Sequence, residues 1–450
     1  CFWIPIGRRY KRAMAHVTAT FEDGRTSSAG HGEVSPGEIV VGVIIGRASE
    51  FFDFFVYAIA SVIVFPRLVF THHDPLTGTL LSFAIFALAF VARPFGTALF
   101  MAVDRTHGRG AKMTSALVLL GTSTVAIAFL PGYDDIGVAA IWLLALARIG
   151  QGLALGGTWD GLASLLALNA PEGRRGWYAM LPQLGAPVGL IVASALFAFF
   201  VGNLSAEDFF DWGWRYPFFV AFAINVVALF SRLRMVQTPS YRQIYEQREL
   251  QPSRVLPTLR AEGKNVVIGA FVPLVSFAMF HMVTVFPLSW VFLFTREGPA
   301  RFLVIEAISA VFGLFAIVAS GILADRIGRR RLLGGSAIAI AAFSGFAPQL
   351  LDAGFAGELT FMILGFILLG LAFGQSSGSV ASRFSRAYRY TGSAITTDLA
   401  WLFGAGFAPL VALILSSQFG LIASGAYLLS GALVTMLVLW LTNVSDRGKA

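Results

Sequence analysis

Long apolar stretches separated by short polar connections fill the chain from residue 38 onward. A helix needs about 20 mostly apolar residues to cross a bilayer, whereas a strand of a membrane barrel needs only about 10 alternating ones. The stretches are too long for barrel strands, so they predict transmembrane helices. We place twelve of them, at residues 39–66, 77–103, 112–130, 137–168, 177–201, 214–235, 265–294, 300–324, 332–350, 358–382, 391–417 and 420–443.

One connection is much longer than the others and divides the chain into two sets of six predicted helices. It runs from Arg232 to Lys264 and is polar. We therefore predict an all-α integral membrane protein with two parallel six-helix halves. The expected parts are a flexible cytoplasmic tail (1–37), a first half (38–235), a cytoplasmic linker (236–263), a second half (264–443) and a cytoplasmic tail (444–450).

The amino-acid composition also indicates a protein that is surrounded partly by lipid. Of the 450 residues, 56% are hydrophobic and 13% are charged, against about a quarter charged in soluble proteins. The net charge of +8 does not indicate nucleic-acid binding, because topology explains where the charges lie. The single cysteine, Cys1, excludes a disulfide framework and a thiolate metal site.

The basic residues predict the orientation. If the tails and every second connection lie on one side, that side holds 26 of the 33 Lys and Arg residues, the other side holds four, and three lie within spans. Cytoplasmic connections are the ones enriched in Lys and Arg. We therefore expect a multi-pass protein of a bacterial-type inner membrane, with both termini in the cytoplasm.

Two pairs of similar segments show an internal repeat. VDRTHGRGAK (103–112) follows the second predicted helix, and ADRIGRRR (324–331) follows the eighth, half a chain later. GRRGWY (173–178) and RAYRYTG (386–392) precede the fifth and eleventh helices. Parallel six-helix repeats place a substrate site between the halves, near the middle of the bilayer.

At these residues the sequence resembles the major facilitator superfamily. The family's loop signature is a Gly, three residues, then Asp-Arg-x-Gly-Arg-Arg/Lys. It is matched in full by Gly321, Asp325, Arg326, Gly328, Arg329 and Arg330. A second signature is the pattern Arg-x-x-Gln-Gly in the fourth helix, which matches Arg148, Gln151 and Gly152.

Further motifs are similar to those of the metabolite:proton symporter family, which includes shikimate, dicarboxylate, citrate and proline-betaine transporters. They are EFFDFFVY, ARPFG, LPGYDDIG, RRGWYAMLPQLGAP, WGWRYPF and RYTG, in the family's order. This resemblance implies proton-driven uptake of small metabolites. Three departures from the family's motifs are present. Phe100 replaces the Gly of the first-half loop signature, and Thr106-His107 adds a residue to that loop. GGTWDG replaces GGEWGG in the fourth helix, so Thr158 takes the place of the Glu and Asp160 is an additional acid.

Charged residues in the first helix are candidates for proton coupling. Glu50, Asp53 and Tyr57 are spaced to share one helix face, while phenylalanines cover much of the rest. Two acids one turn apart repel each other, which favours a proton on one of them. The alternative is that either acid is a structural partner of an arginine such as Arg148. Arg47 is closer to the helix end and is expected to snorkel.

Arg148 is the main candidate for substrate binding. It lies near mid-depth in the fourth helix, and its planar fork of donors suits a carboxylate. It is expected to hold either a substrate carboxylate or Asp53, with Gln151 one turn away as a further donor. A fixed structural ion pair is the alternative.

Other polar residues within spans are weaker candidates. Arg93 is expected to snorkel or to pair with a loop, and Glu306 is a possible functional acid in the eighth helix. Pro182, Gly185 and Pro187 predict a kink around Gln183. The further candidates for proton coupling or substrate binding are Asp160, Gln183, His281, Gln375 and Asp398.

The loop charges are expected to gate the cytoplasmic side. An aspartate facing the positive N-terminus of a helix is electrostatically favoured, so such clusters can latch that side shut. Ordinary positive-inside charge is the alternative reading. The candidate gating residues are Asp104, Arg105 and Arg109 in the first half and Asp325, Arg326, Arg329 and Arg330 in the second.

Together these features predict a proton-coupled symporter that imports a carboxylate or a zwitterion by alternating access. Its expected partners are the substrate, protons and the lipid bilayer, and it is expected to act as a monomer. A proton gradient supplies the energy and no cofactor is expected, since no GxxxxGK[ST] motif is present. An exporter on the same fold and a non-transporting sensor are the alternatives. An enzyme is not expected, because no catalytic constellation is found.

Overall fold

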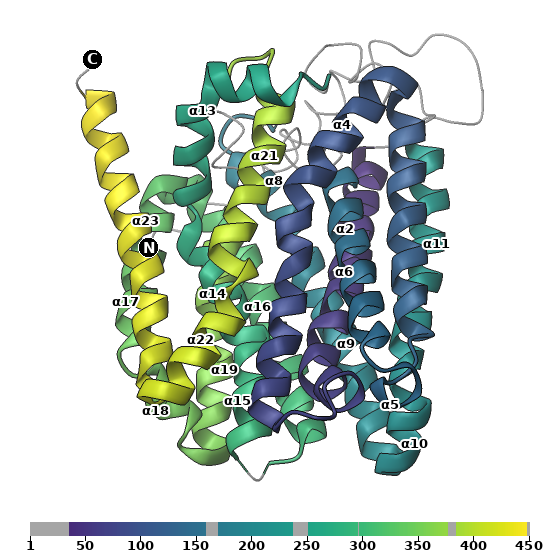
Figure 1. The fold of residues 1–450 in the computed structure, drawn as a ribbon. Coiled ribbons are helices and arrows are strands. Elements are labelled where there is room, and N and C mark those ends of the chain that lie inside the picture. Colours follow the sequence, from purple (N-terminus) through teal and green to yellow (C-terminus); the bar gives the residue numbers. More distant parts are fainter. Residues whose placement is uncertain (1–35, 159–169, 237–250, 296, 377–383, 448–450) are drawn as a thin grey trace, which may run out of the picture. The chain divides into compact units, whose positions relative to one another are not determined.

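Helices running between two ends of a bundle make up most of the structure (Figure 1). The computed structural model describes residues 36–158, 170–236, 251–295, 297–376 and 384–447, and these ranges contain no β-strand. Residues 35–450 group into one compact unit. The predicted tail at 1–37 thus lies almost entirely outside the described residues, and so does the first half of the predicted linker, residues 237–250.

The first six predicted spans appear as helices, several of them in pieces. Gly108 has a φ of 82°, and there the chain turns back within α4, so α4 contains both the second and the third predicted spans. The kink predicted around Gln183 is present as a 3₁₀ turn between two helices. The elements are α2 (Pro36–Ile63), α3 (Phe65–Leu68), α4 (Pro75–Ala128), α5 (Tyr133–Ile136), α6 (Ala139–Gly157), α8 (Arg175–Met180), η1 (Leu181–Leu184), α9 (Gly185–Asn203), α10 (Ala206–Asp211), η2 (Gly213–Arg215) and α11 (Tyr216–Val236).

The second set of six follows the same plan. The seventh span is interrupted near Pro273 and Pro287, since proline lacks the N–H that continues a helix. The eleventh contains one π-helical turn. The elements are α13 (Val255–Phe271), α14 (Leu274–Thr284), α15 (Phe286–Phe294), α16 (Pro299–Ile327), α17 (Arg329–Ser344), α18 (Ala347–Leu351), α19 (Gly354–Phe373), α21 (Arg389–Trp401), η3 (Leu402–Gly406), α22 (Ala408–Phe419) and α23 (Ile422–Arg447).

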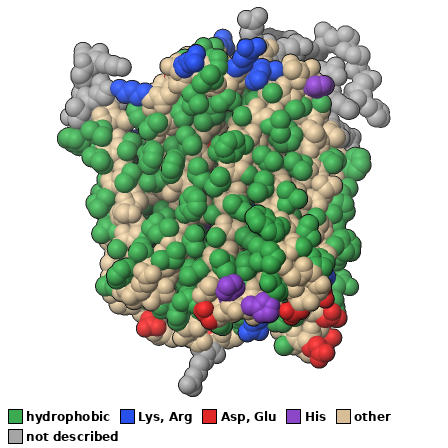
Figure 2. All heavy atoms as spheres, in the orientation of Figure 1, with side chains coloured by type: hydrophobic (Ala, Val, Ile, Leu, Met, Phe, Trp, Pro, Cys, Tyr) green, Lys and Arg blue, Asp and Glu red, His purple; other side chains and the backbone are tan. Residues whose placement is uncertain are grey.

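Length and composition identify most of these helices as membrane spans. Within the described residues, nine helical segments are long and apolar enough to cross a bilayer, and one of them is the two-pass α4. Two further helices complete twelve passes. They are α2, which carries four charged residues, and α17, which has 16 residues. On the face that Figure 2 shows, the surface between the two ends is largely apolar.

Charge is distributed unequally between the two ends. In Figure 2, Lys and Arg side chains gather at the upper end, and Asp and Glu side chains gather at the lower end. We call the upper end, with the exposed Arg105, Arg326 and Arg330, the basic end. We call the lower end, with the exposed Asp74 and Asp134, the acidic end. The unequal placement of basic loops that the sequence predicts is therefore present in the structure.

Candidate substrate and proton site

Asp53 lies inside the first half rather than against the second. It is 3% exposed on α2, and three side chains from other helices surround its carboxyl group. Thr124 on α4 donates to it at 2.6 Å, while Gln151 on α6 and Asn225 on α11 donate at 3.4 Å. Asn225 is a partner that the sequence reasoning missed, although an asparagine in an otherwise apolar span is a visible signal.

Arg148 is connected to Asp53 through Gln151. Its Nη1 donates to Gln151 Oε1 at 3.0 Å, and Gln151 Nε2 in turn donates to Thr124 at 2.9 Å and to Asp53. The ion pairs of the described residues do not include Arg148 with Asp53. The direct contact considered from the sequence is therefore replaced by a relay through an amide.

Aromatic rings surround the Arg148 guanidinium. Its carbon lies 3.9 Å from the ring centroid of Tyr57 and 4.8 Å from that of Phe86, while its Nε donates to the carbonyl of Phe86 at 3.2 Å. Arg148 is 1% exposed. Within the described part of the chain, Arg148 Nη2 and the Tyr57 hydroxyl have no hydrogen-bond partner. The Arg148 Nη2 and the Tyr57 hydroxyl are therefore available as donors, and such a pair is suited to binding an anionic or polar ligand.

Close helix packing holds this network in place. A Cβ atom on Gly152 would lie 2.3 Å from the carbonyl oxygen of Ala89, and one on Gly156 would lie 2.4 Å from that of Arg93. Both glycines are on α6 and both carbonyls are on α4. Small residues of this kind let membrane helices approach closely. The Gly of the Arg-x-x-Gln-Gly pattern thus brings Arg148 and Gln151 against α4.

Glu50 belongs to a different environment from Asp53. It forms an ion pair with Arg47 at 2.6 Å, and both residues line a pocket of about 480 Å³, part of which is open to solvent. Besides these two, the pocket is lined by Phe51, Phe54, Ala89, Phe90, Arg93, Leu155, Thr158 and Trp401. The predicted common face of Glu50, Asp53 and Tyr57 is therefore divided between this pocket and the interior of the first half.

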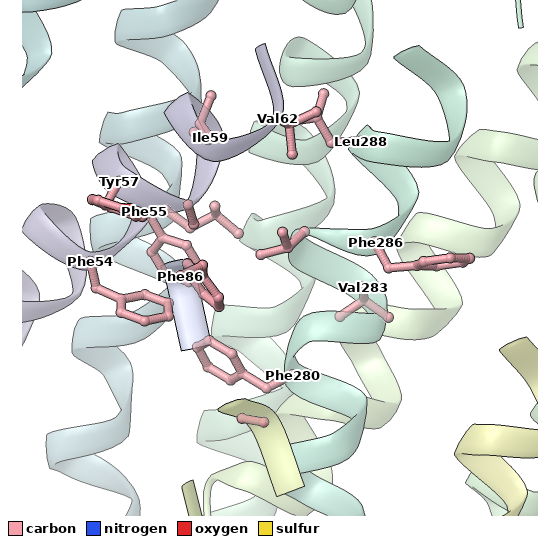
Figure 3. Close-up of a cluster of buried hydrophobic side chains, with 14 of the residues drawn as sticks. Phe54, Phe55, Tyr57, Ile59, Val62, Phe86, Phe280, Val283, Phe286 and Leu288 are labelled. Carbon is pink, nitrogen blue, oxygen red and sulfur yellow. The ribbon is translucent and has the colours of Figure 1, made fainter. Parts of the chain in front are cut away.

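An aromatic cluster contributed by both halves lies beside this pocket (Figure 3). Phe54 and Phe86 come from the first half and face Phe280 of the second. His281, also of the second half, is fully buried, with its ring 5.4 Å from Phe54 and 5.3 Å from Phe86. Its Nδ1 lies 3.4 Å from Thr284, and its Nε2 has no partner in the described part. His281 therefore lies in the same aromatic region as Arg148.

Asp398 meets the first half at Arg93. Arg93 Nε on α4 lies 2.8 Å from Asp398 Oδ1 on α21, and the Thr97 hydroxyl lies 2.5 Å from Asp398 Oδ2. Arg93 is 9% exposed, and Asp398 is 3% exposed. The expectation that Arg93 snorkels or pairs with a loop is wrong, because an acid of the second half neutralises it inside the bundle. Two opposite charges within spans were the signal for this pair.

The second-half signature joins the two halves at the basic end. Asp325 accepts from the backbone N–H groups of Gly176 and Trp177 at 2.6 and 3.0 Å, at the start of α8. Gln375 donates to the Gly176 carbonyl at 3.0 Å and accepts from Arg329 Nε at 3.3 Å. The structure thus places Gln375, a predicted substrate residue, among the predicted gating residues.

The altered first-half signature makes different contacts. Asp104 lies 3.7 Å from Lys112 Nζ, and Lys112 donates to the Tyr390 hydroxyl of α21 at 2.8 Å. The Arg109 guanidinium lies 4.8 Å from the Tyr390 ring centroid, and Arg105 donates to the backbone carbonyl of Ser253 at 3.0 Å. Both signatures therefore join their own half to the other half or to the linker.

The remaining predicted residues lie elsewhere. Arg330 donates to the backbone carbonyl of Leu439 within the second half, and Arg326 is exposed. Gln183 is buried in η1, and its Oε1 has no partner in the described part. Asp160 lies outside the described residues. Within the ranges that the structure covers, no cluster of His, Cys, Asp or Glu could hold a metal ion.

Known proteins resemble this chain over most of its length. The profile of the Major Facilitator Superfamily matches residues 48–409. Inner membrane metabolite transport protein YhjE of Escherichia coli (strain K12) is 38% identical, with 91% of this chain and 94% of that protein covered. The Shikimate transporter of the same organism is 28% identical, with 90% and 94% covered.

A comparison of folds agrees with the sequence matches. The crystal structure of a D-xylose-proton symporter superposes with a TM-score of 0.67 at 18% identity, covering 89% of this chain and 96% of that one. The chain belongs to the major facilitator superfamily. It is a multi-pass cytoplasmic-membrane transporter of metabolites and not an enzyme.

Proposed function

We propose that this protein is a proton-coupled symporter that imports a small polar metabolite carrying a carboxylate, either an organic acid or a zwitterion. The observation that carries the proposal is the buried relay from Arg148 through Gln151 to Asp53. A charge within a membrane helix costs several kcal/mol unless it has a partner or a function. In the described part of the chain, Arg148 has an Nη2 without a hydrogen-bond partner, and it is connected through one amide to an acid that can bind a proton.

The relay supports a coupling mechanism. A proton on Asp53 weakens its hydrogen bonds from Gln151 and Asn225, because a neutral carboxyl group accepts less strongly than a carboxylate. Gln151 is then free to turn with Arg148 toward a substrate carboxylate in the aromatic region. Glu50, paired with Arg47 at the pocket, is the second candidate for this proton.

Conformational change follows from the contacts between halves. When the loaded halves rock, the Arg93–Asp398 pair and the Asp325 contacts at the basic end separate, and the pocket beside Glu50 opens. We place the basic end in the cytoplasm because Lys and Arg are enriched in cytoplasmic loops. Both termini then lie in the cytoplasm, the single chain works as a monomer, and the proton gradient is the only energy source.

Proton flux in proteoliposomes tests the proposal. Purified protein is reconstituted with an internal pH dye, and shikimate, citrate, a dicarboxylate, betaine and xylose are added singly. We expect one carboxylate-bearing compound to acidify the lumen, and we expect Asp53→Asn and Arg148→Lys each to lower the initial rate about tenfold or more. Arg301→Lys is the matched control, because Arg301 pairs with Glu297 at the acidic end. Unchanged flux in both variants, or alkalinisation that indicates export, would contradict the proposal.

A further inference from the structure

Glu306 is a buried acid that the proposed relay does not use. It lies on α16, is fully buried, and accepts one hydrogen bond, from the Ser194 hydroxyl of α9 at 3.0 Å. Its Oε1 has no partner in the described part of the structure. The hydroxyl of Ser309, nearly one turn further along α16, is also fully buried and has no partner there.

Four other buried acids of the described residues have stronger partners, and the fifth, Glu358 on α19, is 2% exposed. Glu50, Asp104 and Asp398 each pair with a cation, at 2.6, 3.7 and 2.8 Å. Asp53 accepts from three donors, one of which contacts Arg148. A carboxylate with a single hydroxyl partner and no water contact would carry a large desolvation cost, which binding a proton removes.

Neighbouring helices do not supply a counter-charge. α9, α15 and η1 carry no ionisable side chain, so Ser194 is the polar group that faces Glu306 from α9. On α16 itself Arg301 is paired with Glu297 at 2.5 Å, and Asp325 and Arg326 lie about five turns beyond Glu306 along the helix. The other titratable groups on elements that pack against α16 are Glu358 on α19, Arg175 and Tyr178 on α8, and Arg329, Arg330 and Arg331 on α17.

The Ser194–Glu306 hydrogen bond joins the two halves. α9 belongs to the first half and α16 to the second, and the two helices pack against each other. An apolar pocket of about 290 Å³, part of which is open to solvent, is lined by Leu190 of α9 and Gly313 of α16, one and two turns from Ser194 and Glu306. Glu306 therefore lies where rocking of the halves changes its access to water.

We propose that Glu306 is a proton-binding site of the transport cycle, loaded in the conformation described here and emptied when the halves separate. In that step the carboxyl O–H bond breaks, the proton passes to water, and the carboxylate remains hydrated in the opened interface. The inference rests on the proposed proton-coupled function and adds to it a second site, in the other half from Asp53.

Infrared difference spectroscopy tests this site without any substrate. Protein in lipid films is titrated with alkali while the carbonyl stretch of protonated carboxyl groups is recorded, so that the proton itself is the probe. We expect wild type to lose such a band, and we expect the band to be smaller in Glu306→Gln and unchanged in Asp352→Asn, the control in which an exposed acid is replaced. An identical band in wild type and Glu306→Gln would overturn the proposal.

Transport assays separate this inference from the proposed function. The substrate is the compound that moves protons with wild type in the proteoliposome assay described above. With it, we expect Glu306→Gln to retain substrate exchange within about twofold of wild type and to lose about tenfold in gradient-driven accumulation. If wild type and Glu306→Gln couple substrate uptake to proton entry equally well, only the inference about Glu306 fails. If no compound moves protons with wild type, the proposed function fails.

A second variant keeps the test open if Glu306→Gln does not fold. Ser194→Ala removes the one hydroxyl that donates to the carboxylate, so the infrared band should persist to higher pH. An unshifted titration in Ser194→Ala would count against the site.

Discussion

Arg93 and Asp398 form a buried ion pair between the two halves, with Nε 2.8 Å from Oδ1. Arg93 lies in the second span and Asp398 in the eleventh, and Arg93 lines the same pocket as Glu50. Trp401, one turn from Asp398, lies 5.9 Å from the guanidinium. The pair therefore joins the halves directly beside the space that we propose the substrate uses.

Breaking this pair from one side should destabilise the protein. Asp398→Asn leaves the Arg93 charge buried without a partner, which costs about 3–5 kcal/mol. We expect a lower melting temperature in detergent and slower transport. The double variant Arg93→Gln/Asp398→Asn removes both charges and should recover part of the loss. A double variant less stable than Asp398→Asn would contradict a direct pair.

Close packing at Gly176 should be needed to shut the basic end. A Cβ there would lie 2.7 Å from the Ala324 Cβ and 2.8 Å from the Gly321 carbonyl oxygen. Gly176→Ala should therefore hold α8 and α16 apart. Leu155→Cys, which lines the pocket, reports opening cleanly once Cys1, the only cysteine, is replaced by Ser.

We expect Gly176→Ala to raise labelling of Leu155→Cys by a membrane-impermeant thiol reagent several-fold. The reagent should reach it from the basic end. Gly263→Ala is the control, since a Cβ at Gly263 meets nothing within 4 Å. Equal labelling in the two variants would show that Gly176 does not limit closure.

Overpacking the contact between α4 and α6 should lower stability. In Gly152→Ala the new methyl group would lie 2.3 Å from the Ala89 carbonyl oxygen, so a helix must shift. Strained insertions of this kind cost about 1–3 kcal/mol. Thermal unfolding in detergent measures the loss, with Gly334→Ala, whose nearest neighbour would be 3.9 Å away, as the control. Equal melting temperatures would contradict the packing described for Gly152.

Restoring the family's glycine at Phe100 should harm the protein. Phe100 is 5% exposed, and its Cδ2 would lie 2.5 Å from a Cβ on Gly157, so the ring occupies the space that this glycine leaves. Phe100→Gly opens a cavity and should cost about 3–5 kcal/mol, as large core truncations do. Phe100→Gly/Gly157→Ala should not recover this loss, because the added methyl group would still lie 2.6 Å from the Ala116 Cβ, and full recovery in thermal unfolding would contradict this packing.

Helix number and membrane class could be predicted because they depend on local patterns. Twelve apolar runs appear as helices, and Gly108 turns the chain between the second and third. Proline and glycine spacing was enough to predict the break at η1. Prolines also mark the breaks in the seventh span, but the pattern of apolar residues predicted one continuous helix there.

Partners of the buried charges were harder to predict because they depend on how the helices pack. The spacing of Glu50 and Asp53 indicates a shared face, but their side chains reach different neighbours, Arg47 and Thr124. Likewise, nothing local to Gln375 shows that Gly176 contacts it. Residues far apart in the sequence supply these contacts.

The most direct measurement is gradient-driven accumulation, because it tests whether proton binding at the Arg148–Gln151–Asp53 relay drives uptake. Proteoliposomes with an alkaline lumen receive the labelled compound that moved protons in the panel. We expect wild type to accumulate the compound above its external concentration, a protonophore to collapse this accumulation, and Asp53→Asn only to equilibrate the compound. Accumulation by Asp53→Asn equal to that of wild type, or wild-type uptake that stops at equilibrium, would contradict it.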